Sequence, residues 1–268
     1  MSRFKDHLWL WGQDVMSHQK RGFWKIPSGN KMDAAEGARW LGIENVFRVV
    51  MTGMPVPPFD EETRKLADMK KVVWSAVGDL SSRRNNEKTD LDEVLRQAKL
   101  FPNVTGAILD DFFFRDEEKD TWARWDIGTV RDMKRQLHDA GLEFSVVWYK
   151  QALQWPVQDY LKEFDVITYW NLAEYTEKDE LPQDLQTMLE KTPGRRRMTG
   201  CYLWNYGGAK PLSIEELKRD CELFRGMLMK KQTEGIIFCA NCILDVGGPA
   251  MDWVRGWIAE HADDPVPD

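Results

Sequence analysis

Short runs of apolar, β-branched and aromatic residues alternate with amphipathic stretches along the whole chain. Runs of five to eight such residues are typical of buried strands, and apolar positions three to four residues apart are typical of helices. The pattern predicts strands at 7–12, 45–51, 71–77, 104–110, 143–149, 165–171, 199–205 and 235–241. It predicts helices between and after them, at 33–40, 61–69, 90–99, 127–140, 157–164, 182–191, 213–231 and 249–261.

Several helix ends carry recognisable local signals. Asp33 is followed by Glu36, and Ser213 by Glu216, which is the spacing of a capping box at a helix N-terminus. Gly141 follows the helix predicted at 127–140 and is a suitable C-terminal stop.

Eight strand–helix units within 268 residues predict a single (β/α)8 TIM barrel. We expect it to span residues 1–262, with 263–268, DDPVPD, as a flexible C-terminal tail. A doubly wound sheet is the competing fold, but it usually has a glycine-rich phosphate loop after the first strand. The chain instead has WGQDVMSHQK at that point, which favours the barrel.

Composition narrows the range of partners. The formal net charge of -7 argues against nucleic acid or an anionic membrane as the main partner. The first residues become polar too quickly for a signal peptide, so we expect a cytoplasmic protein or one exported after its signal was removed. The oligomeric state is left open. The pair Cys239 and Cys242 falls in the strand predicted at 235–241 or just beyond it, and we interpret both as buried structural thiols.

In TIM barrels the active site lies at the C-terminal ends of the strands. These ends carry Trp or Tyr beside amides and carboxylates. Aromatic rings can stack on the C–H faces of a sugar while amides and carboxylates bind its hydroxyl groups, so a carbohydrate site is favoured over aromatic barrel packing alone. The candidate binding residues are Trp11, Gln13, Asp14, Arg48, Tyr149, Lys150, Trp170, Asn171, Trp204, Asn205, Tyr206, Asn241 and Asp245.

The stretch GAILDDFFF contains the strongest candidate for catalysis. Asp110 and Asp111 stand at the end of an apolar strand, where both side chains can turn towards the mouth of the barrel. Two close carboxylates drive their pKa values apart, so one can stay protonated while the other is charged, as glycosidic bond cleavage requires. The structural alternative is that Asp111 only caps the turn before the charged loop RDEEKD.

The motif ILDDFF resembles TIM-barrel glycoside hydrolases, and locally the O-GlcNAcase-type hexosaminidases, which have adjacent aspartates at the end of strand four. That resemblance implies that Asp110 polarises the 2-acetamido group of the substrate and that Asp111 is the general acid/base. A resemblance to α-galactosidase-like barrels would instead imply Asp110 as nucleophile and Glu174 as acid. The strand-seven Glu nucleophile of another large clan is replaced here by Asn205, in LWNYGG.

The sequence therefore predicts a glycoside hydrolase of carbohydrate metabolism that cleaves a small glycan or glycoside, with catalytic candidates Asp110, Asp111 and Glu174. We expect no metal and no organic cofactor. Two alternatives stay open: a non-catalytic carbohydrate-binding barrel, and a lyase or aldolase that acts on a sugar or sugar phosphate through Lys150. Paired glycines in NYGGAK and DVGGPA lie where phosphate sites occur in barrels, although they also suit ordinary turns.

Overall fold

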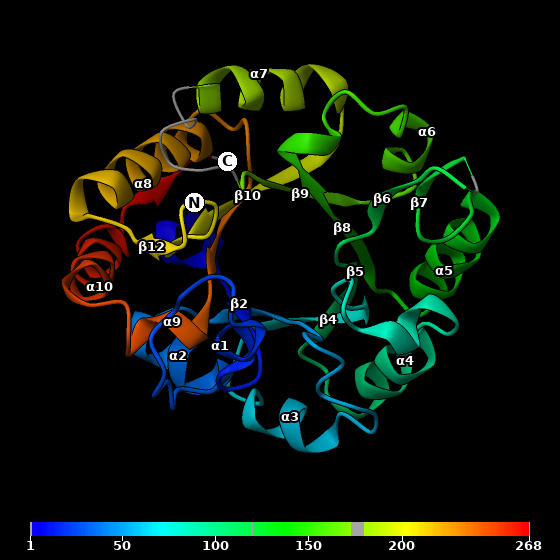
Figure 1. Ribbon diagram of the computed structural model, residues 1–268, viewed down its shortest axis with the longest axis horizontal. Coiled ribbons are helices and arrows are strands. Elements are labelled where there is room, and N and C mark those ends of the chain that lie inside the picture. The colour runs from blue at the N-terminus through cyan, green and yellow to red at the C-terminus, as the bar shows by residue number, and fades with distance from the viewer. Residues whose placement is uncertain (1, 119, 173–179, 268) are drawn as a thin grey trace.

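The computed structural model describes residues 2–118, 120–172 and 180–267. Eight parallel strands close into a barrel in the order β10-β13-β2-β3-β4-β5-β8-β9 (Figure 1). The predicted TIM barrel is confirmed. The strands are β2 (Leu8–Gly12), β3 (Asn45–Arg48), β4 (Lys71–Val77), β5 (Val104–Leu109), β8 (Glu143–Tyr149), β9 (Val166–Trp170), β10 (Arg196–Tyr202) and β13 (Gly235–Cys239).

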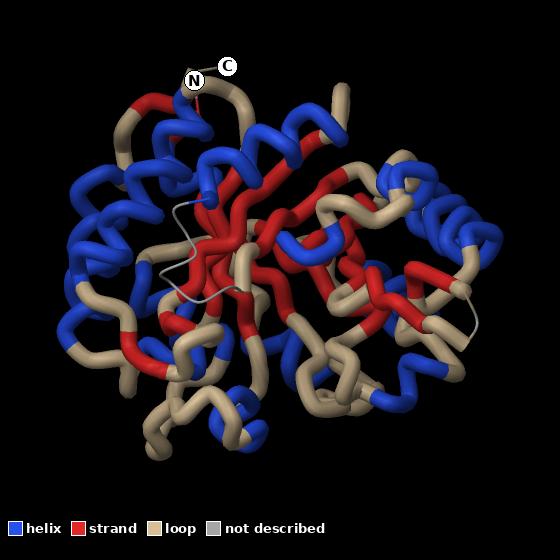
Figure 2. The backbone as a smooth tube through the Cα atoms, turned by 45° about the horizontal axis from the view of Figure 1, so that its top comes forward, coloured by secondary structure: helices blue, strands red, loops and turns tan. Residues whose placement is uncertain are grey.

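Helices surround this barrel on its outside, as the ring of blue tube around the red strands shows in Figure 2. The principal helices are α2 (Ala34–Leu41), α3 (Asp60–Lys65), α4 (Leu91–Leu100), α5 (Ile127–Asp139), α6 (Gln158–Leu161), α7 (Leu181–Lys191), α8 (Ile214–Met229) and α10 (Pro249–His261). Shorter helical segments are α1 (Ser17–Arg21), α9 (Asn241–Leu244), η1 (Phe4–His7), η2 (Arg83–Asn86) and η3 (Lys150–Ala152).

The local signals at the helix ends act as predicted. Asp33 accepts a hydrogen bond from the backbone N–H of Glu36, whose carboxylate accepts from the N–H of Asp33. Ser213 and Glu216 form the same reciprocal pair at the start of α8. Gly141 follows α5 with φ +73°, a left-handed conformation that favours glycine.

The strands predicted at 45–51 and 235–241 end earlier than expected. The strand predicted at 45–51 leaves the ladder after Arg48, because Met51 pairs with Met54 in a tight turn instead. The strand predicted at 235–241 ends at Cys239, and the chain then forms α9, so Cys242 lies on a helix and not on a strand. Both thiols are buried, as predicted.

Trp204 and Asn205 do not continue β10. They form a separate strand β11 (Trp204–Asn205), which pairs with β12 (Lys210–Pro211). A second unpredicted hairpin, β6 (Phe113–Asp116) with β7 (Thr121–Ala123), follows β5 and contains part of the charged loop.

The C-terminal segment packs against the start of the chain, where composition predicts a flexible tail. Strand β14 (Pro265–Val266) pairs antiparallel with β1 (Ser2–Arg3), and the two chain ends lie side by side in Figures 1 and 2. Val266 is buried, and Asp264 accepts a hydrogen bond from Arg225. The polar composition of the tail gave no sign of this pairing because two-residue strands carry no periodic signal.

No helix in the described part of the chain has the length and apolar character needed to cross a bilayer.

Candidate active site

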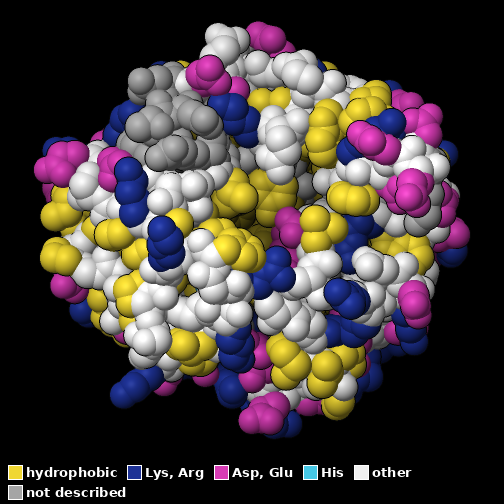
Figure 3. All heavy atoms as spheres, in the orientation of Figure 1, with side chains coloured by type: hydrophobic (Ala, Val, Ile, Leu, Met, Phe, Trp, Pro, Cys, Tyr) yellow, Lys and Arg dark blue, Asp and Glu magenta, His cyan; other side chains and the backbone are white. Residues whose placement is uncertain are grey.

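A cavity of about 250 Å³ opens at the C-terminal ends of the barrel strands. Figure 3 shows it as the central hollow of this face, with hydrophobic side chains on its wall and an acidic side chain at its edge. It is lined by Trp11, Gln13, His18, Trp24, Met51, Asp79, Leu80, Asp110, Asp111, Tyr149, Gln151, Trp170, Leu172, Tyr202, Tyr206 and Cys239.

The adjacent carboxylates follow β5 directly. Asp110 stays in line with the barrel, because its backbone N–H donates to the carbonyl of Val77 at 2.9 Å. Asp111 turns out of the strand with φ +42°, and its N–H donates to Oδ1 of Asp110 at 2.8 Å. The N–H of Leu80 donates to Oδ2 of Asp111 at 3.0 Å. The two side chains are thereby held on the same cavity wall.

Burial governs the protonation of this pair. Asp110 is only 4% exposed, and burial raises its pKa well above the usual range, with the charges of Asp111 and Asp79 adding to the effect. Burial also raises the pKa of Asp111, although the hydrogen bond from Leu80 opposes it. A proton is therefore retained on the pair at a pH where an exposed aspartate would have lost it.

Asp79 follows β4 and lies beside the pair on the cavity wall. It accepts hydrogen bonds from the N–H of Thr52 at 2.9 Å and from the hydroxyl groups of Ser81 and Ser82 at 2.5 and 2.6 Å. These donors hold it in one orientation, and it adds a third carboxylate to the same wall.

Arg124 supplies a positive charge that acts on the pair, and the sequence did not identify it. It follows β7, and its guanidinium donates to the carbonyl of Gly78 at 2.5 Å and to Asn86 at 2.8 Å. Its charge opposes the rise in pKa of both Asp110 and Asp111. The residue after the β6–β7 hairpin thus places a cation close to the carboxylates but outside the cavity lining.

Aromatic rings form the floor of the cavity. The ring centroids of Trp11 and Trp170 are 5.0 Å apart, and those of Trp170 and Tyr202 are 5.2 Å apart. Gly200 makes room for the Trp170 ring, because a Cβ at that position would lie 2.0 Å from a ring carbon. Tyr149 lies against Asp111, and burial raises the pKa of this tyrosine well above its usual value, so its hydroxyl stays protonated.

Seven of the predicted site residues line the cavity, at the C-terminal ends of the strands where the sequence predicted a site. They are Trp11, Gln13, Asp110, Asp111, Tyr149, Trp170 and Tyr206. The cavity residues that the sequence prediction missed lie mostly in loops or short turns, where the chain direction could not be inferred. They are His18, Trp24, Met51, Asp79, Leu80, Gln151, Leu172, Tyr202 and Cys239.

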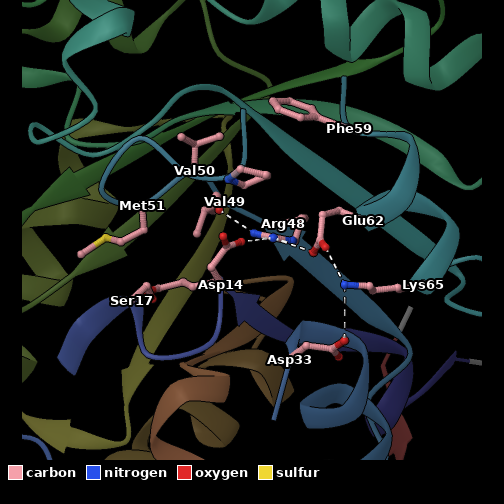
Figure 4. Close-up of polar contacts among 12 residues, drawn as sticks. Asp14, Ser17, Asp33, Arg48, Val49, Val50, Met51, Phe59, Glu62 and Lys65 are labelled. Atoms are coloured by element: carbon pink, nitrogen blue, oxygen red, sulfur yellow. Dashed lines mark hydrogen bonds and ion pairs between the residues drawn. The ribbon is translucent and has the colours of Figure 1, made fainter. Parts of the chain in front are cut away.

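Arg48 and Asp14, predicted to bind substrate, do not line the cavity. Arg48 is fully buried and pairs with both Asp14 and Glu62, and Lys65 continues the network to Asp33 (Figure 4). The Arg48–Glu62 distance is 2.7 Å. These charges neutralise one another in the region between β3 and α3. We therefore correct the predicted role of Arg48 and Asp14 from substrate binding to a structural one.

Lys150 also lies away from the cavity lining. Its Nζ is 2.8 Å from Glu180 and 3.3 Å from Asp184. Partial burial lowers its pKa, but these ion pairs outweigh that effect and the net shift is upward. A Schiff-base lysine must lose its proton to attack a carbonyl, so this environment contradicts the aldolase alternative.

The remaining predicted binding residues also lie outside the cavity lining. Asn241 holds the backbone of Gln13 in place, donating to its carbonyl at 3.0 Å and accepting from its N–H at 2.7 Å. Asp245 accepts backbone hydrogen bonds from Lys31 and Met32. Three others are buried at strand ends without reaching the cavity: Asn171, Trp204 and Asn205. Glu174 lies outside the described residues.

Within the described ranges, no group of three or more His, Cys, Asp and Glu side chains is arranged to hold a metal ion. The arrangement can provide carboxylate acid/base chemistry beside an aromatic surface.

No family model matches the chain, and no curated protein matches its sequence. Solved structures do match. The chain is similar to a "putative alpha-L-fucosidase" from Bacteroides thetaiotaomicron VPI-5482, with 13% identity, a TM-score of 0.59, and coverage of 97% of this chain and 96% of that one. It is similar to the PgaB (BpsB) glycoside hydrolase domain from Bordetella bronchiseptica, with 10% identity, a TM-score of 0.55, and coverage of 93% and 98%.

A third similar structure is a mutant tryptophan synthase α-subunit from Pyrococcus furiosus, with 10% identity, a TM-score of 0.52, and coverage of 97% and 98%. At these identities the similarities establish the (β/α)8 barrel fold. Because one barrel fold serves many reactions, function has to be argued from the site.

Proposed function

We propose that this protein is a glycoside hydrolase that cleaves a small glycan or glycoside by carboxylate acid/base catalysis. The observation that carries the proposal is the pair Asp110 and Asp111, which lie side by side with raised pKa values on the wall of an aromatic-lined cavity. Glycosidic cleavage needs a carboxylic acid that keeps its proton near neutral pH and a second carboxylate close to the reaction centre.

Asp111 is the better proton donor of the two. Its side chain is half-buried, whereas that of Asp110 is almost completely buried. The Leu80 N–H donates to Oδ2 of Asp111 and the Tyr149 hydroxyl also hydrogen-bonds to this carboxyl group, so the acid is held in place at the cavity, where we propose that it meets the glycosidic oxygen. In the proposed reaction Asp111 gives its proton to that oxygen as the C–O bond breaks. It then takes a proton from the water that adds to the anomeric carbon.

Asp110 has a supporting role in this scheme. Its Oδ1 accepts the N–H of Asp111, and the residue lines the cavity beside Asp111. There it can hold a polar group of the substrate or stabilise the positive charge that develops at the anomeric carbon. This division of roles agrees with the one that the O-GlcNAcase resemblance implies.

The size and lining of the cavity support a small substrate. At about 250 Å³ it lies just below the usual range of about 300–1,000 Å³ for ligand pockets. One sugar ring against Trp11 and Trp170 would use most of this space, so we propose that a terminal sugar residue enters the cavity. The names of two similar structures, a glycoside hydrolase domain and a fucosidase, agree with this class of reaction.

The test is a panel of α- and β-linked 4-nitrophenyl glycosides with the purified full chain. We expect release of nitrophenol from at least one, and a loss of about 10²–10⁴-fold in kcat for Asp111→Asn. Asp139→Asn, an exposed carboxylate on α5, is the matched control and should retain wild-type activity. Near-full turnover by both Asp110→Asn and Asp111→Asn would contradict the proposal. Sugar binding without any cleavage would support the non-catalytic alternative.

A further inference from the structure

The cavity has a second polar wall on the side of the barrel opposite the carboxylates. In the closed strand order, β13 stands four strands from β5, and β2 and β10 are the strands on either side of β13. Gln13 follows β2, His18 lies on α1, and Tyr206 follows β11, and all three line the cavity. A ligand in the cavity would therefore lie between these residues and the pair Asp110 and Asp111.

These three side chains form a hydrogen-bonded relay. The hydroxyl group of Ser17 donates to Oε1 of Gln13 at 2.6 Å. Nε2 of Gln13 lies 2.7 Å from Nε2 of His18, and Nδ1 of His18 lies 2.8 Å from the hydroxyl oxygen of Tyr206. Gln13 is itself fixed through its backbone by Asn241. The imidazole is thus held at both of its nitrogens.

The relay determines where the proton of His18 lies. Burial lowers the pKa of His18 to about 3, with a further contribution from Arg21, so the imidazole is neutral. Because Oε1 of Gln13 already accepts from Ser17, the amide presents its N–H₂ to His18, and Nε2 must accept. The single imidazole proton is then on Nδ1, and Nδ1–H donates to Tyr206.

This tautomer leaves the hydroxyl hydrogen of Tyr206 without an acceptor within the relay. Burial raises the pKa of Tyr206 well above its usual value, so the phenol keeps its proton. Among the described residues, the other hydrogen-bonding neighbour of the hydroxyl is Sγ of Cys239 at 4.0 Å, and a thiol is a weak acceptor. The O–H is therefore available to a ligand in the cavity.

The charge of the residues that line the cavity restricts which ligands can bind there. Among the described residues that line the cavity, none is Lys or Arg, whereas Asp79, Asp110 and Asp111 all contribute carboxyl groups. Arg124 donates to backbone carbonyls and does not line the cavity. A phosphate or carboxylate on the ligand would have no cation to pair with and would lie close to these acids, which is unfavourable in a poorly solvated site.

We propose that His18 is a positioning residue that fixes the Tyr206 hydroxyl as a donor to the ligand, and that the cavity takes a sugar ring without an acidic group. That this sugar is cleaved rests on the proposed function, whereas the binding of an uncharged sugar by the Tyr206 hydroxyl does not. The inference assigns a recognition role to Tyr206 and argues against the phosphorylated substrate that the paired glycines left open.

Calorimetric titration separates binding from cleavage. Wild-type protein would be titrated with methyl glycosides of neutral hexoses, fucose and N-acetylhexosamines in both anomeric forms, and with methyl glucuronide, methyl galacturonide and glucose 6-phosphate. We expect binding of at least one uncharged sugar and no measurable binding of the acidic ones. Binding confined to the acidic sugars, or equally tight binding of these, would overturn the proposal, as would no binding of any uncharged sugar.

Variants test the relay with the sugar that binds. Tyr206→Phe should raise Kd about tenfold, the size expected for one lost hydrogen bond that leaves its partner buried. His18→Leu should have a similar effect, and His18→Asn should restore most of the affinity because its amide can donate from near the position of Nδ1. Unchanged Kd in Tyr206→Phe, or equal Kd in both His18 variants, would refute the relay.

Thermal unfolding of each variant shows whether the barrel stays folded, and the cleavage assay shows which proposal has failed. Binding of an uncharged sugar without cleavage would contradict the proposed hydrolase and leave the present inference intact. Cleavage of a 4-nitrophenyl glucuronide would support the hydrolase and overturn the inference.

Discussion

The backbone N–H of Asp111 donates to the side chain of Asp110 at 2.8 Å, so the two neighbouring acids are joined by a hydrogen bond of their own chain. Asp111 reaches this position with φ +42°, a conformation that is uncommon for residues other than glycine and tends to occur at functional sites. Two consecutive strand residues would point to opposite faces, and the turn at Asp111 brings both carboxyl groups to one wall. The turn therefore places the charge of Asp111 beside Asp110, which adds to the rise in the pKa of Asp110 that burial causes.

Asp110→Asn should stabilise the protein near neutral pH, by about 0.5–2 kcal/mol, the range of common stabilising substitutions. Burial raises the pKa of Asp110 in the folded state, so the folded protein binds more protons than the unfolded one above the ordinary pKa of about 3.9. Stability therefore falls as pH rises through the interval up to the raised pKa. Urea unfolding at pH 4 and pH 7 should show a larger gain for Asp110→Asn at pH 7, and a gain that is larger at pH 4 would contradict this.

Arg124→Gln should move the alkaline limb of the pH–activity profile to higher pH. The charge of Arg124 lowers the pKa of both Asp110 and Asp111, so its removal favours the protonated form of the pair. If the proposed acid must carry a proton, activity on a 4-nitrophenyl glycoside persists to higher pH in the variant. A limb that stays in place or moves to lower pH would show that the pair does not govern it.

Arg115→Gln is the matched control for this measurement. Arg115 lies on the same β6–β7 hairpin, but it pairs with the exposed side chain of Asp120. Its removal should leave the pH profile unchanged, because exposed charges are strongly screened by solvent.

The barrel and the carboxylate pair could be predicted from the sequence because both depend on local signals. Apolar runs, capping boxes and strand ends are all visible within about ten residues. Asp110 follows β5 directly, so the rule that barrel sites lie at strand ends was sufficient to place it. Trp11 and Trp170 were placed correctly for the same reason, since each is at or next to the last residue of its strand.

The other half of the site depends on contacts between distant segments. His18 and Tyr206 are 188 residues apart, and their hydrogen bond follows from how two loops fold over the barrel. Arg48 was misassigned for a related reason. An arginine at a strand end is a reasonable ligand-binding residue when its ion-pair partners are unknown, and these partners, Asp14 and Glu62, are 34 and 14 residues away in the sequence. Periodicity carries no information about such pairings.

Arg48→Met should lower the free energy of unfolding by about 3–5 kcal/mol, the usual effect of removing one partner of a buried ion pair. Arg48 is 0% exposed, and without it Asp14 and Glu62 would face each other with no cation between them. Arg39→Met is the matched control: its pair with Asp68 is exposed, so a change below about 1 kcal/mol is expected. Similar losses for the two variants in urea unfolding would refute the structural role of Arg48.

Gly200→Ala should destabilise the barrel by about 1–3 kcal/mol and weaken sugar binding, because it overpacks the cavity floor. The new Cβ would lie 2.0 Å from Cε3 of Trp170, so the indole ring would have to shift and change its packing against Trp11 and Tyr202. Gly226→Ala in α8 is the matched control, since nothing lies within 4 Å of its added Cβ and alanine favours the helix by about 0.5–1 kcal/mol. Thermal unfolding should show higher stability for Gly226→Ala and lower stability for Gly200→Ala. Calorimetric titration should show an unchanged Kd for Gly226→Ala and a raised Kd for Gly200→Ala. A Gly200→Ala protein with wild-type Kd would show that the Trp170 ring does not form part of the sugar-binding surface.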